Sequence, residues 1–161
     1  TTVERLCHES MAGCEDVCQI AQCLFADGFT CAGSETAVNT LLAKMRATQG
    51  CKQVALLKTM GSGAFHTPLM VPAKERFRKA LEHVKDSMKP AKFDVYMGLR
   101  AARVDSNTSS AEIIDLLCDQ LTSPARWEET VHAMLQDGVG QFYECGPMQQ
   151  LKGMMRRIDP Q

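Results

Sequence analysis

The stretch Gly63-Ala64-Phe65-His66-Thr67-Pro68-Leu69-Met70 joins a glycine-rich loop to a helix and carries a histidine at the junction. The loop covers residues 59–67, and Pro68, which suits the first turn of a helix, opens a predicted helix that runs to about Met88. A side chain in a loop just before a helix can reach into a cleft, so His66 is the best single candidate for chemistry. The alternative is a histidine that only hydrogen-bonds a loop carbonyl near the helix start.

The sequence before this loop predicts a helix, a hairpin, a second helix and a short strand. Apolar spacing and turn residues place these elements at residues 1–12 (helix), 17–25 and 29–32 (strands), 34–50 (helix) and 54–57 (buried strand). Asp27-Gly28 is a strong turn signal between the two strands, and Ser34 is a typical N-cap.

The sequence after the loop continues the alternation of helices and short strands. The long helix is expected to bury an apolar stripe that includes Phe77 and Val84. Further elements are expected at residues 93–97 (strand), 109–121 and 123–138 (helices), 141–145 (strand) and 146–158 (helix). Ser109 and Glu112 form a capping box, and Ser123-Pro124 and Gly146-Pro147 are typical helix starts. The predicted fold class is therefore α/β or α+β.

Composition describes a globular chain without a strong charge. The 161 residues are 45% hydrophobic and 23% charged, which argues against disorder. Because 18 Lys and Arg offset 19 Asp and Glu, neither a nucleic acid nor an anionic membrane is an expected partner. No apolar run is long enough to span a membrane. The chain starts at Thr1 without an initiating Met or a signal peptide, so we expect a cut, processed or partly observed sequence.

The eight cysteines are expected to be reduced and mostly buried thiols in a reducing compartment. Cys7, Cys118 and Cys145 fall among apolar neighbours inside predicted elements, as free core thiols do. No CxxC pair occurs, and the cysteines between residues 14 and 23 lack the usual spacing of zinc ligands. No metal site is therefore predicted.

Most short catalytic motifs are missing from the sequence. There is no P-loop, dinucleotide fingerprint or HExxH, and Ser62 is flanked by Met60 and Ala64 where a nucleophile elbow needs glycines. Gly61 and Gly63 could cradle a phosphate or serve a turn that needs positive φ, and the spacing alone leaves both open.

Several blocks of the sequence resemble, in the same order, segments of the malonyl-CoA:acyl carrier protein transacylases. Residues 63–70 (GAFHTPLM) resemble that family's G-x-F-H-[ST]-x-x-M, residues 120–127 (QLTSPARW) its Q-L-x-x-P-V-x-W, and residues 142–147 (FYECGP) its L-Y-E-V-G-P. Residues 152–158 are similar to its tail helix, and residues 21–33 to a hairpin that ends in V-I-S-G. The likeness covers nearly the whole chain, and the blocks together are specific.

The resemblance implies a fold and a reaction. Residues 1–58 would form a partial ferredoxin-like small subdomain without its first strand, and residues 59–161 the C-terminal portion of a hydrolase-like α/β acyltransferase body. The family moves malonyl from coenzyme A to the phosphopantetheine thiol of an acyl carrier protein, in fatty-acid or polyketide synthesis, through a seryl ester. The coenzyme A thioester and phosphopantetheine are substrates, and no separate cofactor is implied.

The resemblance also assigns roles to three residues. His66 matches the general base that activates the serine and later the incoming thiol. Gln120 matches the residue whose main-chain carbonyl orients that histidine, which is the logic of a triad with a carbonyl in third place. Phe65 matches the position next to the histidine where phenylalanine usually accompanies malonyl, which implies a substrate-binding role.

The family's nucleophilic serine and its carboxylate-binding arginine lie in an N-terminal half that has no counterpart in this sequence. The chain alone is therefore expected to be inactive, and the expected partners are an acyl carrier protein, a complementing N-terminal half or other subunits of a larger complex. Residues 22–28, residues 96–100 and Met148 depart from the family pattern. These departures favour an alternative, a catalytically inactive homologue that serves as a structural or interaction subunit. The expected location is the cytoplasm, or a plastid or mitochondrial interior in a eukaryote.

Overall fold

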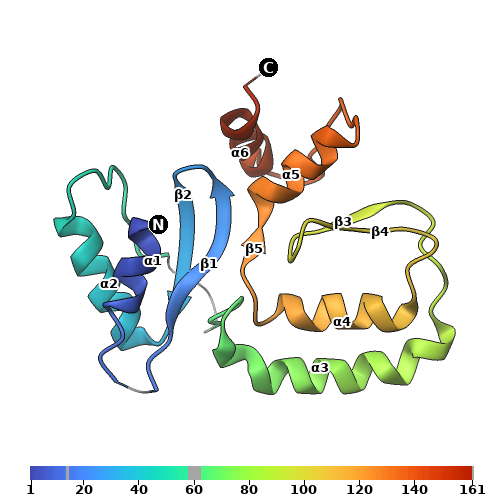
Figure 1. Ribbon diagram of the computed structural model, residues 1–161, viewed down its shortest axis with the longest axis horizontal. Helices are drawn as coiled ribbons and strands as arrows, with labels where there is room; N and C mark the ends of the chain where they lie inside the picture. The colour runs from blue at the N-terminus through green and yellow to red at the C-terminus, as the bar shows by residue number, and fades with distance from the viewer. Residues whose placement is uncertain (14, 58–62, 161) are drawn as a thin grey trace.

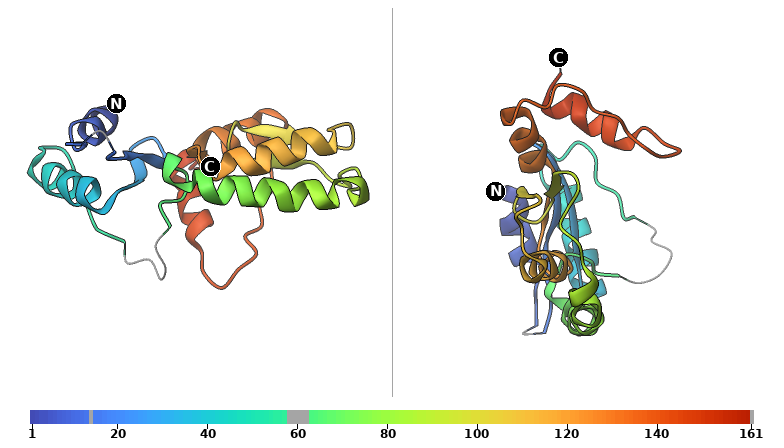
Figure 2. Two further views of the ribbon diagram at one scale, coloured as in Figure 1. Left: turned by 90° about the horizontal axis from the view of Figure 1, so that it is seen from below. Right: turned by 90° about the vertical axis from the view of Figure 1, so that its right-hand side faces the viewer.

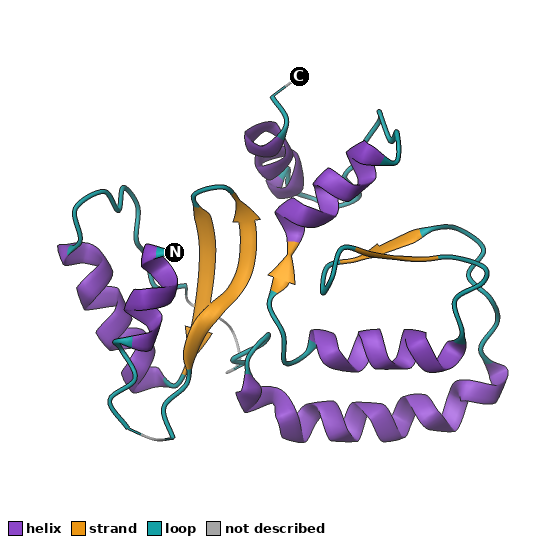
Figure 3. Ribbon diagram, in the orientation of Figure 1, coloured by secondary structure: helices purple, strands orange, loops and turns teal. Residues whose placement is uncertain are grey.

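The computed structural model describes residues 1–13, 15–57 and 63–160 of the chain (Figure 1). Its elements follow in the order α1 (Thr2–His8), β1 (Cys18–Phe25), β2 (Gly28–Gly33), α2 (Glu35–Ala47), α3 (Val71–Val84), β3 (Val95–Met97), β4 (Ala102–Val104), α4 (Ser110–Gln120), β5 (Ala125–Arg126), α5 (Trp127–Gln136) and α6 (Gln150–Ile158). The mixture of helices and short strands (Figure 3) confirms the predicted α/β class. Among the described residues, no helix is long and apolar enough to cross a membrane.

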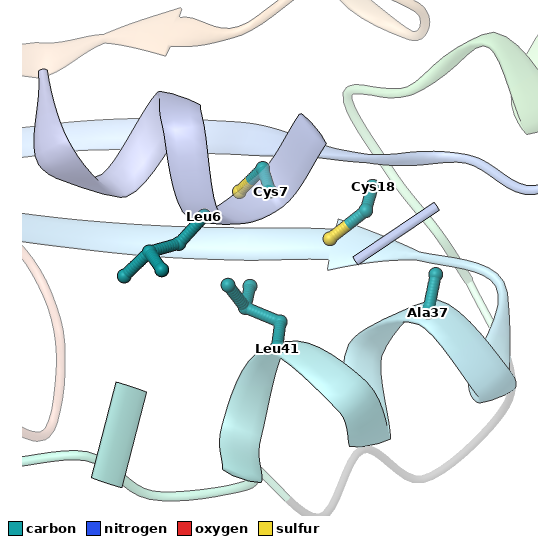
Figure 4. Close-up of a cluster of buried hydrophobic side chains, with 5 residues drawn as sticks. All are labelled: Leu6, Cys7, Cys18, Ala37 and Leu41. Carbon is teal, nitrogen blue, oxygen red and sulfur yellow. The ribbon is translucent and has the colours of Figure 1, made fainter. Parts of the chain in front are cut away.

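The first buried cluster joins two helices to a hairpin. β1 and β2 pair antiparallel, with Phe25 opposite Gly28 across the turn, and α1 and α2 pack against one side of them (Figures 1 and 2). The buried side chains that meet there are apolar and come from α1, β1 and α2 (Figure 4): Leu6, Cys7, Cys18, Ala37 and Leu41. Ala37 and Leu41 share one face of α2 because they are four residues apart, and this face attaches α2 to the hairpin.

The second strand pairing links distant parts of the chain. β5 runs parallel to β1, with Gln22 opposite Ala125 and Cys23 opposite Arg126, so the sheet has the order β2-β1-β5. The main-chain N–H of Arg126 also donates to the carbonyl of Gly98 (2.6 Å). This sheet contains residues of both predicted units, 1–58 and 59–161, and the division into two units stays a prediction.

The remaining part of the fold consists of α3, α4 and the β3–β4 hairpin. α3 lies beside α4 (Figures 1 and 2), and two ion pairs join them, Lys74–Asp119 and Arg78–Asp115, each 2.7 Å. α4 packs against the hairpin through a second buried cluster, formed by Leu99, Val104 and Leu116.

The apolar stripe of α3 is exposed, which corrects the predicted buried face. None of the residues of α3 is buried, and Phe77 and Val84 are 37% and 48% exposed. Within the described ranges α4 is the main element packed against α3, and its link to α3 includes two ion pairs. The stripe therefore lacks a covering layer in this structure.

Two predicted strands are wrong. Residues 54–57 and 141–145 form no strand, and they lie in loops that project from the body (Figure 2). Leu56, Leu57 and Tyr143 are 53%, 64% and 84% exposed. A strand needs a hydrogen-bonded neighbour to be stable, and none of the described segments pairs with either stretch.

Several predicted helix boundaries also shift. The long helix begins at Val71 and ends at Val84, inside the predicted range from Pro68 to about Met88. The first helix ends at His8, well before residue 12. Ser123-Pro124 does not open a helix, because Ala125 and Arg126 pair with β1 and the helix begins at Trp127. The last helix begins at Gln150, after a loop that contains Gly146-Pro147.

The cysteines that the structure describes are all free thiols. Cys7, Cys18 and Cys118 are buried as expected, whereas Cys145 is exposed, because the strand that was to bury it does not form. Cys14 and residues 58–62, including Ser62, lie outside the described residues.

Candidate active site

His66 lies in a tight turn at the start of the α3 segment. The hydroxyl of the buried Thr67 donates to the Ala64 carbonyl (2.6 Å) and closes this turn. Pro68 then begins a single 3-10 turn that leads into α3. His66 itself has φ of 64°, a left-handed conformation that is uncommon for a residue other than glycine. Such a conformation persists only where the surroundings fix it.

The imidazole of His66 is held by carbonyl groups at the end of α4. Its Nδ1 lies 2.8 Å from the carbonyl oxygen of Gln120 and 3.1 Å from that of Ser123. The main-chain N–H of His66 donates to the Leu121 carbonyl (2.9 Å). Carbonyl groups of a helix's last turn lack partners within the helix, so the end of α4 presents acceptors where His66 needs them.

These contacts determine which ring nitrogen carries the proton. Two carbonyl oxygens can only accept, so Nδ1 must be the donor, and in the neutral ring Nε2 keeps its lone pair. A histidine in this tautomer can take a proton at Nε2 while Nδ1–H stays bound, as in a Ser-His-Asp site. Here a main-chain carbonyl occupies the place of the aspartate.

Residues 120–127 connect the predicted histidine partner to the sheet. Gln120 ends α4, and after the turn at residues 121–124 the chain enters β5, which pairs with β1. The structure thus brings His66 and Gln120 together, although they are 54 residues apart in sequence. Trp127 is half-buried at the start of α5, and its indole Nε1 is shielded without a hydrogen-bond partner among the described residues.

Phe65 lies next to His66 but does not share its contacts. The side chain is 53% exposed, and its ring covers Gly63 so closely that a Cβ there would lie 2.1 Å from it. The glycine at 63 therefore makes room for the Phe65 ring. A substrate-binding role for Phe65 stays a prediction.

His66 lies outside both hollows that the structure shows most clearly among its described residues. Two shallow hollows, of about 440 and 300 Å³, lie against the outer face of α3 and between Phe25 and α6, and His66 lines neither. In the described ranges, no group of three or more His, Cys, Asp or Glu side chains could hold a metal ion.

Glu144 has a role that the sequence did not indicate. Its carboxylate accepts hydrogen bonds from the main-chain N–H groups of Leu151 (2.9 Å) and Lys152 (3.0 Å), in the first turn of α6. These N–H groups have no partner within a helix, and a negative charge suits this end of the helix dipole. A strand was expected here, but the chain instead forms a loop that caps the next helix. Glu144 lies seven residues before Leu151, whereas the capping rules that can be applied to a sequence cover residues only about three apart, so the sequence alone does not indicate this cap.

The cap predicts a pH-dependent contribution to stability. The N–H groups of Lys152 and Leu151 hold the pKa of the Glu144 carboxyl below its usual value. The stabilisation is therefore complete above about pH 4.3, the unfolded-state pKa of glutamate, and is lost as the pH falls through the lower folded-state value. We expect Glu144→Gln to speed amide hydrogen exchange in α6 at neutral pH, and the difference from the native chain to shrink in acid. The exposed Glu15→Gln is the control, and equal exchange in both variants would contradict the cap.

Comparison with known proteins identifies the same group that the sequence blocks resemble. No protein-family model matches the chain. A human mitochondrial malonyl-CoA-acyl carrier protein transacylase is 34% identical over 149 residues, which cover 90% of this chain and 36% of that protein. The crystal structure of an acyl-carrier-protein S-malonyltransferase from Burkholderia pseudomallei is 30% identical and superposes with a TM-score of 0.85, over 99% of this chain and 48% of that one.

A second similar structure contains a partner. It is a type II polyketide acyl carrier protein in complex with its malonyl-transacylase, 27% identical with a TM-score of 0.87, over 98% of this chain and 48% of that one. The chain spans about a third of the length of the curated relatives it matches and just under half of the solved structures. By sequence and fold, the chain is similar to the malonyl-CoA:acyl carrier protein transacylases, over less than half of their length.

Proposed function

We propose that this chain supplies the general base of a malonyl-CoA:acyl carrier protein transacylase, and that the nucleophilic serine lies on a complementing segment. The observation that carries the proposal is the contact between His66 Nδ1 and the Gln120 carbonyl (2.8 Å), which leaves Nε2 as the base. The sequence blocks that resemble the family are the ones that build this contact.

The proposed reaction uses Nε2 of His66 twice. Nε2 takes the proton of the serine hydroxyl as the serine oxygen attacks the malonyl thioester, the C–S bond breaks, and the coenzyme A sulfur leaves with that proton. Nε2 then takes the proton of the phosphopantetheine thiol, whose sulfur attacks the seryl ester and releases the serine oxygen, which regains the proton. Throughout, the Gln120 carbonyl stabilises the imidazolium through Nδ1–H.

Exposed apolar side chains support a complementing segment. Large apolar residues are exposed in the turn before α3 and along α3, at the start of β3 and just before it, and in the loop before α6 and its first turn: Leu69, Val71, Phe77, Val84, Phe93, Val95, Phe142, Tyr143, Met148 and Leu151. Phe77 and Val84 belong to one apolar stripe of α3, and an apolar helix face left exposed in this way is typical of an interaction site. The similarity to full-length transacylases suggests their remaining portion as the occupant, and the similar carrier complex suggests an acyl carrier protein as the substrate partner. The proposed location is a compartment that holds both the complementing portion and an acyl carrier protein: the cytoplasm, or the interior of a plastid or mitochondrion.

Intact-mass measurement after incubation with malonyl-CoA tests the proposal. We expect no malonyl adduct on this chain alone, because the serine that would hold it lies elsewhere. With the serine-bearing portion of a similar transacylase added, we expect an adduct on that portion and its transfer to holo acyl carrier protein. An adduct on this chain would contradict the divided site.

The same experiment addresses the non-catalytic alternative. A stable complex that forms no adduct and transfers no malonyl would favour a structural subunit, to which the departures at residues 22–28, residues 96–100 and Met148 point. A serine-bearing portion that is equally active without this chain would overturn the proposed role of His66.

A further inference from the structure

The main chain of His66 is also held by a group from another part of the chain, the side chain of Gln19. The carboxamide Nε2 of Gln19 donates to the carbonyl oxygen of His66 at 2.7 Å, across 47 residues of sequence. Gln19 lies near the start of β1, whereas the other groups that contact His66 belong to the end of α4 and the turn after it. Neither its residue type nor its spacing from the histidine singles Gln19 out.

Hydrogen bonds at three of its polar groups together fix the orientation of His66. Leu121 accepts from its main-chain N–H, Gln120 and Ser123 accept from its Nδ1, and Gln19 donates to its carbonyl oxygen. The left-handed φ of 64° is unfavourable for a side chain with a Cβ, so the peptide on the carbonyl side would relax if it were released. The first two contacts do not restrain that peptide, whereas the contact with Gln19 does.

Gln19 is itself firmly placed. The main chain of Gln19 pairs with Ala32 of β2, and the neighbouring Cys18 is buried in the cluster that joins α1 and α2 to the hairpin. Further along β1, Gln22 pairs with Ala125 of β5, which follows the turn that holds the imidazole. The strand therefore fixes the carboxamide relative to the Gln120 carbonyl.

We propose that Gln19 is a positioning residue for His66. Its carboxamide holds the His66 peptide in the conformation that aims Nδ1 at the Gln120 carbonyl and leaves Nε2 free to accept a proton. The catalytic part of this inference rests on the proposed role of His66, but the effect of Gln19 on the imidazole does not.

The state of the imidazole gives a direct test, without any need for activity. Nitrogen-15 NMR of histidine side chains in the native chain is expected to show His66 as a single neutral tautomer, with the proton on Nδ1. Gln19→Met keeps the length of the side chain and removes the donor, and we expect it to give a mixture of tautomers or exchange broadening at His66. Gln22→Met, on the same strand, is the matched control and is expected to leave the His66 signal unchanged.

A second variant protects the test against a folding defect. Gln19→Glu keeps the shape of the side chain, and its carboxylate cannot donate at neutral pH, so it should perturb the His66 tautomer as well. In a complemented, active enzyme both variants should lower kcat with little change in KM for malonyl-CoA. A single Nδ1–H tautomer in both Gln19 variants, or its absence in the native chain, would overturn the proposal. A native tautomer with no transfer activity would instead reject the proposed function and leave Gln19 as the group that orients the ring.

Discussion

Replacement of His66 by alanine is expected to lower kcat/KM for malonyl transfer by about 10²- to 10⁴-fold in the complemented enzyme. The reason is that Nε2 of His66 is the proposed acceptor for the protons of both nucleophiles, the serine hydroxyl and the phosphopantetheine thiol. Without it, each step must proceed through a neutral hydroxyl or thiol. The measurement is the initial rate of malonyl transfer from malonyl-CoA to holo acyl carrier protein.

His83 provides a matched control for this experiment. It is an exposed histidine on α3 whose Nδ1 also contacts a main-chain carbonyl, that of Lys79, at 3.0 Å. His83→Ala should leave the rate unchanged, because its ring faces no reacting group. Gln120→Ala should retain most of the activity, because Gln120 acts through its main-chain carbonyl. Equal rates for His66→Ala and His83→Ala would contradict the proposed base.

Turn and helix-cap residues correctly predicted the elements that depend on interactions between residues close together in the sequence. The turn at residues 26–27 lies between two strands close to the predicted ones, and the hydroxyl of Ser109 caps α4 by accepting from the Glu112 N–H (3.2 Å). Ser34 is the N-cap of α2 as predicted, but its hydroxyl donates to the Asp16 carboxylate (2.8 Å) instead of capping the helix. A nearby acceptor in the folded chain outcompeted the local capping bond.

The failed strands depended on partners that the sequence pattern does not contain. Residues 54–57 and 141–145 have strand-like composition, yet a strand forms only against a neighbour. The helix start predicted at Ser123-Pro124 failed for a related reason, because pairing of Ala125 and Arg126 with β1 holds this stretch extended. In each case a tertiary contact, or its absence, overrode the local preference.

The candidate site could be predicted only in part for a different reason. His66 was identifiable from its place between a loop and a helix, but the group that orients it is a main-chain carbonyl, which every residue has. Gln120 was therefore accessible only through the resemblance to a known family. Gln19 donates to a main-chain oxygen as well, and nothing in its local sequence distinguishes it from other glutamines.

Substitution of Gly33 by alanine is expected to destabilise the chain by about 3 kcal/mol, the upper end for overpacking. A Cβ at Gly33 would lie 1.8 Å from the carbonyl oxygen of Val17 and 2.9 Å from the Cα of Cys18. Both atoms belong to the main chain, so no side-chain rotation can relieve the clash. The end of β2 would have to separate from β1, which breaks the hydrogen bond from the Ser34 N–H to the Val17 carbonyl (2.8 Å).

Thermal unfolding should show this as a fall in Tm of about 6–12 °C, given the usual scaling for a chain of this size. Gly140→Ala is the control, because no atom lies within 4 Å of a Cβ built there. Gly33 pairs with Cys18, and Gln19 is the next residue of β1. The displaced strand should therefore also weaken the hydrogen bond from Gln19 to the His66 carbonyl. Gly33→Ala should therefore perturb the His66 tautomer even in molecules that remain folded. A variant that melts with the native chain and keeps the native imidazole signal would contradict both the clash and the coupling of the hairpin to the site.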